Sequence, residues 1–252
     1  MAEPQSLAAK IKPVTGFSHF VHILLMALLP AFIFVFVRLH FIELAVMLIL
    51  LSKWRMLAVK PRHWPANIRA NGVDIIVGLS LLIFMISTGS ALFQLIWATI
   101  YGIWLIVVKP RSTTFGITMQ ALVAQFVGLS AIFLYWGGTP TYALMILTWL
   151  VCYSSARHFF TSFDEPLTRY LSDSWAYFGA ALAWILGHWL LFYGFVSQPT
   201  LLLTVISFSL AGVYYLDQTD KLSVLLRRQL IFVMIAIVVI MLKFSNWGDK
   251  AV

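Results

Sequence analysis

Residues 17–37 read FSHFVHILLMALLPAFIFVFV and contain no Asp, Glu, Lys or Arg. A helix needs about 20 consecutive apolar residues to cross a hydrocarbon core of roughly 30 Å, and this stretch is long enough. Similar stretches recur along the chain, in which hydrophobic residues make up 62% and charged residues only 10%. Soluble domains are closer to about half apolar and about a quarter charged. The sequence therefore predicts an all-α, polytopic transmembrane helical bundle.

Nine apolar segments are expected to cross the membrane as consecutive helical hairpins, although eight crossings result if the second or ninth segment stays on one side. These segments are residues 17–37, 41–52, 73–87, 92–108, 117–136, 142–156, 175–193, 200–216 and 229–244. Residues 1–16 form a cytoplasmic N-terminal segment, residues 17–244 a single transmembrane domain, and residues 245–252 a short tail. The N-terminus lacks the layout of a cleaved signal peptide, so the first segment is expected to stay as a signal-anchor helix.

Basic residues gather in the N-terminal segment and in alternate links between the apolar segments. Of the 17 Lys and Arg residues, all but Arg38, Lys243 and Lys250 lie there. Such an imbalance orients membrane proteins with the basic side in the cytoplasm. We therefore expect a protein of the cell membrane with a cytoplasmic N-terminus and, with nine crossings, an external C-terminus. The net charge of +8 comes from these boundary clusters, so no nucleic-acid partner is expected.

Two short phrases recur at a period near 50 residues. Lys-Pro-Arg occurs at 60–62 and at 109–111, and VGLS occurs at 77–80 and at 127–130. A period that holds one helical hairpin suggests repeated two-helix units, while such short identities leave chance similarity as the alternative. Proline cannot continue a helix, and lysine and arginine favour the cytoplasmic boundary. Both Lys-Pro-Arg copies are thus expected to end a helix that arrives from the outside.

Polar side chains inside the apolar segments are candidates for a ligand site because they are costly in lipid. Asp74 lies near the inner end of the third segment, and Gln120 and Gln125 lie in the fifth. Together they could line the pocket of a small-molecule or lipid permease. The alternative is structural, with Asp74 paired to Arg69 or another cytoplasmic cation and the two glutamines making hydrogen bonds between helices.

The link SSARHFFTSFDEPLTRYLSDSW at residues 154–175 carries the candidates for catalysis. His158 could form an acid–base pair with Asp164 or Glu165, with Arg157 nearby, in a membrane enzyme acting on lipid-linked substrates. The structural alternative is a short amphipathic helix at the membrane surface. Its lipid-facing side chains would be Phe159, Phe160, Phe163 and Leu167, and Ser172 or Asp173 would cap the following helix.

No metal and no other cofactor is expected. His19 and His22 share one helix face, but a second ligand at the same depth is missing because His188 is expected on the opposite side of the bilayer. Cys152 is the single cysteine, which excludes an intramolecular disulfide.

The short loops and the scarcity of polar residues inside the apolar segments favour a non-catalytic membrane subunit or scaffold. It would contact partners or lipids through its basic cytoplasmic loops. Its expected partners are the lipid bilayer and either another membrane protein or a second copy of this chain. The permease and the lipid-directed enzyme stay as the two alternatives, because a fold class by itself does not fix a function.

Overall fold

The computed structural model describes residues 17–56, 58–188, 190–194 and 196–244. The regular secondary structure of this part of the chain is helical apart from one small hairpin of two-residue strands, β1 (Phe192–Tyr193) and β2 (Val196–Ser197). Its α-helices are α1 (Phe17–Arg38), α2 (Ile42–Leu51), α3 (Trp64–Ser87), α4 (Ala91–Ile103), α5 (Thr114–Trp136), α6 (Thr141–Thr161), α7 (Thr168–Gly187), α8 (Gln198–Gln218) and α9 (Val224–Phe244).

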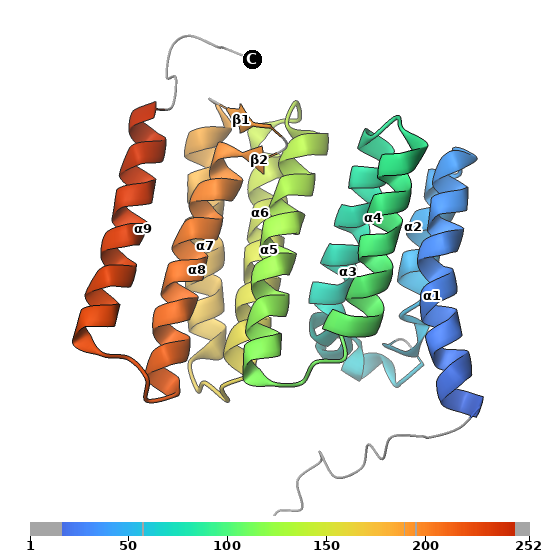
Figure 1. Ribbon diagram of the computed structural model, residues 1–252, viewed down its shortest axis with the longest axis horizontal. Helices are drawn as coiled ribbons and strands as arrows, with labels where there is room; N and C mark the ends of the chain where they lie inside the picture. The colour runs from blue at the N-terminus through green and yellow to red at the C-terminus, as the bar shows by residue number, and fades with distance from the viewer. Residues whose placement is uncertain (1–16, 57, 189, 195, 245–252) are drawn as a thin grey trace, which may run out of the picture.

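The helices lie side by side in an elongated slab of two layers (Figure 1). In this view α1, α4, α5 and α8 are in front, α2, α3, α6 and α7 lie behind them, and α9 stands at one edge against α8. Helix α5 occupies the centre, where it packs against α3, α6 and α8. The links that follow α4, α6 and α8 all lie at the lower end of the slab in Figure 1, which we call the basic end.

Five helices in the described residues are long and apolar enough to cross a membrane. They span Pro61–Ser87, Ala91–Val108, Thr114–Trp136, Gln198–Gln218 and Val224–Phe244. The predicted all-α class is confirmed, and these helices support the prediction of a membrane protein. Helix α2, by contrast, has only 10 residues, which at 1.5 Å per residue is about half of a hydrocarbon core.

The two VGLS copies occupy similar packing positions. A Cβ on Gly78 would lie 2.8 Å from the hydroxyl of Tyr101, and one on Gly128 would lie 2.9 Å from Val151. In both cases the contacted residue is 23 positions further along, in the next helix. A side chain at either position would force a neighbouring side chain to shift, so glycine allows a close approach of the two helices at both positions. The shared contact fits the predicted repeat, although a duplication stays a prediction.

The two Lys-Pro-Arg copies do not have the same role, so this prediction is wrong for the first copy. Helix α2 already ends at Leu51, and Pro61 instead begins a short 3₁₀ helix (Pro61–His63) that leads into α3. Proline suits the first turn of a helix, where its missing N–H has no partner to lose. The second copy follows a π-helix (Trp104–Val108) that continues α4, and there it does end the helix.

The link at residues 154–175 also differs from its prediction. Helix α6 continues to Thr161 and α7 begins at Thr168, so the short surface helix is not formed in these described residues. Asp164 makes the tight turn between them with a positive φ of 51°. Ser172 and Asp173 lie inside α7 rather than at its cap. Hydropathy missed these ends because charged residues can continue a helix beyond its apolar part.

Candidate functional site

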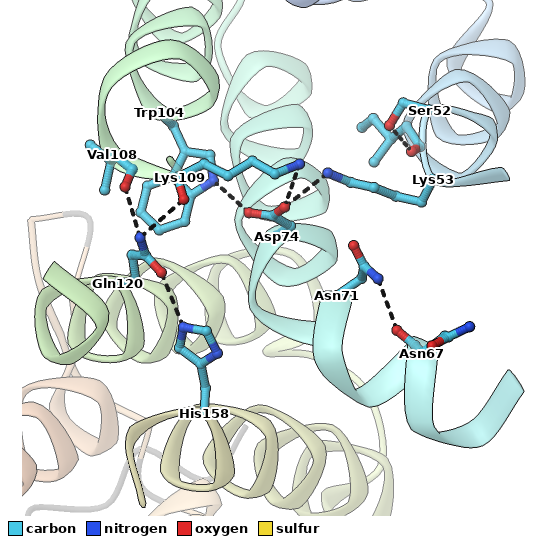
Figure 2. A network of polar contacts seen from close by, with 11 residues as sticks. Ser52, Lys53, Asn67, Asn71, Asp74, Trp104, Val108, Lys109, Gln120 and His158 are labelled. Carbon is cyan, nitrogen blue, oxygen red and sulfur yellow. Dashed lines mark hydrogen bonds and ion pairs between the residues drawn. The ribbon is translucent and has the colours of Figure 1, made fainter. Parts of the chain in front are cut away.

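A buried ion cluster centres on Asp74 of α3. Its Oδ2 lies 3.0 Å from Lys53 Nζ and 2.7 Å from Lys109 Nζ, while its Oδ1 accepts a 3.2 Å hydrogen bond from Trp104 Nε1 (Figure 2). The side chains of Lys53 and Asp74 are only 6% and 12% exposed. The predicted ion pair of Asp74 is therefore present, but Lys53 and Lys109 form it in place of Arg69.

Lys53 reaches this site because α2 stops early. The helix ends at Leu51, and the turn that follows places Lys53 beside α3 rather than letting its side chain extend to solvent. Lys109 arrives from the opposite direction, at the end of the π-helix that continues α4 (Figure 2). Two cations thus share one carboxylate at the basic end, and the cluster carries a net positive charge.

Gln120 of α5 joins the end of the π-helix to α6. Its Nε2 donates to the carbonyl oxygens of Val108 (2.7 Å), Arg111 (3.0 Å) and Lys109 (3.3 Å). Carbonyl groups at a helix end have no partner within the helix, and the amide supplies one. This orientation turns Oε1 toward His158, whose Nε2–H donates over 3.1 Å (Figure 2).

Gln125 lies five residues further along α5 and makes different contacts. Its Oε1 accepts a 3.0 Å hydrogen bond from Trp175 Nε1, and its Nε2 donates to the carbonyl oxygen of Leu203 at 3.3 Å. Asp74, Gln120 and Gln125 therefore do not line one common pocket. Asp74 and Gln120 belong to the polar network of Figure 2, whereas Gln125 faces α7 and α8. Ligand binding by these three residues stays a prediction.

The catalytic candidates are also separated. His158 bonds to Gln120, whereas Glu165 accepts hydrogen bonds from the Tyr214 hydroxyl and the Leu167 N–H. No hydrogen bond or ion pair among the described residues joins His158 to Asp164 or Glu165. The reason is that α6 continues past His158, which fixes its side chain toward α5. The two acids come after the turn, and Glu165 lies beside α8.

Phe159, Phe160 and Phe163 do not form the predicted lipid-facing side of a surface helix. Phe159 is buried, and all three rings pack edge-on against Tyr214 of α8, with centroids 5.2–5.7 Å from its ring. These aromatic contacts hold the end of α6 against α8.

Sequence reasoning missed a cavity of about 630 Å³ between α5, α6, α7 and α8, called here the α5–α8 cavity. Its walls are mostly apolar and include Phe159, Trp175 and Leu210. Ser155 also lines it, and the Ser155 hydroxyl is buried without a hydrogen-bond partner in the part of the chain that the structure describes. The sequence did carry a signal, because small side chains recur on the inward faces of these helices at Ala121, Ser155, Ala156, Ser207 and Ala211.

Comparison of the chain with protein-family models, with curated proteins and with solved structures found no match. The function is therefore inferred from the geometry of these sites.

Proposed function

We propose that this chain is a multi-pass membrane protein that holds one lipid-like amphiphile in the α5–α8 cavity. The observation that carries this proposal is the cavity itself, with its volume of about 630 Å³ and its apolar walls from four helices. Ligand cavities in proteins typically measure about 300–1,000 Å³ and combine apolar walls with a few polar groups. An acyl or isoprenoid chain matches such walls.

The mouth of the cavity supports entry from the surrounding lipid. Phe178 of α7 and Leu210 of α8 line the cavity and are 43% and 47% exposed at the molecular surface. The opening therefore lies between α7 and α8, on an apolar flank of the slab. The inner wall carries Gln125 and Trp175, and the Trp175 indole donates a hydrogen bond to the Gln125 side chain. A lipid chain can slide sideways through such an opening without crossing a polar region.

The unpartnered Ser155 hydroxyl adds a polar contact for the ligand. A buried hydroxyl without a hydrogen bond costs about 1–3 kcal/mol. An ester carbonyl or a hydroxyl of an amphiphile beside Ser155 would remove this cost. The chain would thus be a non-catalytic membrane subunit, as expected from the sequence. Its lipid contact would lie in a cavity rather than on the basic loops.

The proposed topology has nine crossings, with the basic end in the cytoplasm of the cell and the C-terminus outside. In support, α1 and α3 both begin at the basic end in Figure 1, so the α2 segment must return the chain across the slab. Helix α2 makes about half of this crossing, and the irregular link after it makes the rest. Irregular backbone inside a membrane needs partners. Asn67 and Trp64 supply them by donating to the carbonyl oxygens of Met56 and Val59.

The test of lipid binding uses the full chain purified in mild detergent. Native mass spectrometry should find one retained lipid per chain, and a diazirine-bearing phospholipid should crosslink to cavity residues of α7 and α8. Ala211→Trp fills the cavity and should reduce lipid retention about tenfold or more. Its matched control, Ala181→Trp on the exposed face of α7, should retain lipid like the wild type. Equal retention by folded Ala211→Trp protein would overturn the proposal.

A further inference from the structure

Two further hollows lie at the basic end, where residues of α3 and α6 come together. Two adjoining cavities of about 430 and 490 Å³ share Arg69 of α3 and Arg157 of α6 in their walls. Arg169 of α7 lines the larger one. We infer that these three arginines, called here the arginine cleft, form a binding site for a phosphate ester.

The charge of the cleft favours an anion. Its acidic member is Asp173, and the carboxylate of Asp173 lies 3.9 Å from Arg169 Nε in an exposed pair. Within the described residues, neither Arg69 nor Arg157 forms an ion pair. Three arginines and one carboxylate thus line the cleft. The planar guanidinium group binds phosphate oxygens through two parallel hydrogen bonds, which makes arginine the preferred residue for this ligand.

Arg157 is held ready for such a ligand. Its Nη1 donates a 2.7 Å hydrogen bond to the Tyr153 hydroxyl, and its guanidinium carbon lies 5.8 Å from the centre of the Tyr153 ring. The Tyr153 ring in turn stacks on Trp149, with centroids 5.0 Å apart and planes at 5°. This stack fixes the guanidinium while using one of its five N–H donors.

The arginine cleft is separate from the α5–α8 cavity. On α6, the cleft is lined by Trp149, Tyr153 and Arg157, which are spaced four residues apart and share one helix face. The α5–α8 cavity uses the neighbouring positions 155, 156, 159 and 160 on another face. The inference therefore does not rest on lipid binding in that cavity.

The phosphate ester could belong to a phospholipid headgroup or to a soluble molecule. Tyr153 and Trp149 lie one and two helical turns further from the basic end than Arg157, and aromatic residues of this kind are common at the membrane interface. Both ligands would carry a phosphate group whose oxygens accept hydrogen bonds from the guanidinium groups. The two sources are separated by experiment.

The experiment measures binding to the full chain in nanodiscs. One arm compares phosphatidic acid in a phosphatidylcholine background with phosphatidylcholine alone, by native mass spectrometry of retained lipid. The other arm titrates glycerol 3-phosphate and inorganic phosphate, by thermal shift. Enrichment of phosphatidic acid supports a headgroup site, and a saturable shift with the soluble phosphates supports a soluble ligand. No binding in either arm overturns the inference.

The variants test which arginines are responsible. Arg69→Gln and Arg169→Gln alter exposed side chains, and each should weaken binding about tenfold. Arg157→Lys keeps the charge but loses the planar group, and it should weaken binding by a similar factor. Arg228→Gln removes an exposed arginine outside the cleft and should change affinity less than about twofold. Equal losses in Arg228→Gln and the cleft variants would show general charge attraction and overturn the inference.

Discussion

At the scale of single residues, Asp74 determines how the basic end is held together. Its carboxylate is bound by two lysines and by the Trp104 indole, and it connects α3 to the link after α2 and to the end of α4. A buried pair adds little net stability when it is complete, but removing one partner leaves an uncompensated charge.

Asp74→Asn should therefore destabilise the protein. Lys53 stays buried in this variant while its counter-charge is gone, so we expect a loss of about 3–5 kcal/mol in the free energy of unfolding. The measurement is unfolding in detergent, followed by circular dichroism. Asp173→Asn, which disrupts an exposed pair, is the control and should change stability by less than about 1 kcal/mol. A similar small effect of Asp74→Asn would contradict the buried ion cluster.

The two lysines should be able to replace each other as partners of Asp74. Lys53→Met leaves the carboxylate paired with Lys109, so we expect this variant to lose less than about 1 kcal/mol in the free energy of unfolding. The double variant Lys53→Met/Lys109→Met leaves Asp74 without a cation and should lose about 3–5 kcal/mol. Unfolding of both single variants and the double variant gives the coupling between the two sites. If the free-energy losses of the two single variants add up to the loss of the double variant, the two lysines do not share one carboxylate.

At the scale of elements, close contacts between helices depend on small residues at crossing points. Gly128 of α5 is one of these points, because a Cβ there would lie 2.7 Å from Ile76 of α3 and 2.9 Å from Val151 of α6. Glutamine side chains also connect elements, because they donate hydrogen bonds to the free carbonyl groups at helix ends. Gln94 donates to the carbonyl oxygens of Met85 and Thr88 at the end of α3, as Gln120 does after α4.

Gly128→Ala should weaken the packing of α5 against α3 and α6. The added methyl group cannot fit unless the side chains of Ile76 and Val151 shift, and such overpacking costs about 1–3 kcal/mol. Gly138→Ala offers a matched control, since a Cβ there meets nothing within 4 Å. Both variants are compared with the wild type by thermal unfolding in the same detergent. Equal midpoints for the two variants would show that α5 does not need this close approach.

At the scale of the whole molecule, the proposed orientation places the basic end in the cytoplasm. Ser112 lies in the link at this end, and Ser90 lies in the turn between α3 and α4 at the opposite end. Both serines are exposed, while the native Cys152 is buried. Introduced cysteines at these positions therefore report the two sides of the membrane separately.

A membrane-impermeable maleimide should label Ser90→Cys in intact cells and leave Ser112→Cys unlabelled until the cells are opened. We expect this pattern because the proposed orientation places the basic end in the cytoplasm. The wild-type chain controls for reaction at Cys152. The reverse labelling pattern would refute the orientation, and labelling of both positions from outside would refute a crossing between them.

The sequence alone determined the all-α class and the approximate position of each apolar helix, because apolar content and charge are local properties that can be read along the chain. Each predicted segment overlaps a described helix, although α3 begins at Trp64 instead of Val73 and α7 at Thr168 instead of Trp175. An ion pair for Asp74 and interhelical bonds for the glutamines were likewise predictable, since polar groups in lipid need partners.

Only the tertiary structure decided which groups meet. Lys53, Asp74 and Lys109 come together because α2 stops short beside α3 and the π-helix after α4 ends next to Asp74. His158 faces Gln120 rather than an acid because α6 continues past it. The α5–α8 cavity and the arginine cleft each combine side chains from three or four helices. The physical reason is that a contact depends on which helix faces pack together, and that packing is a property of the whole bundle rather than of any one segment.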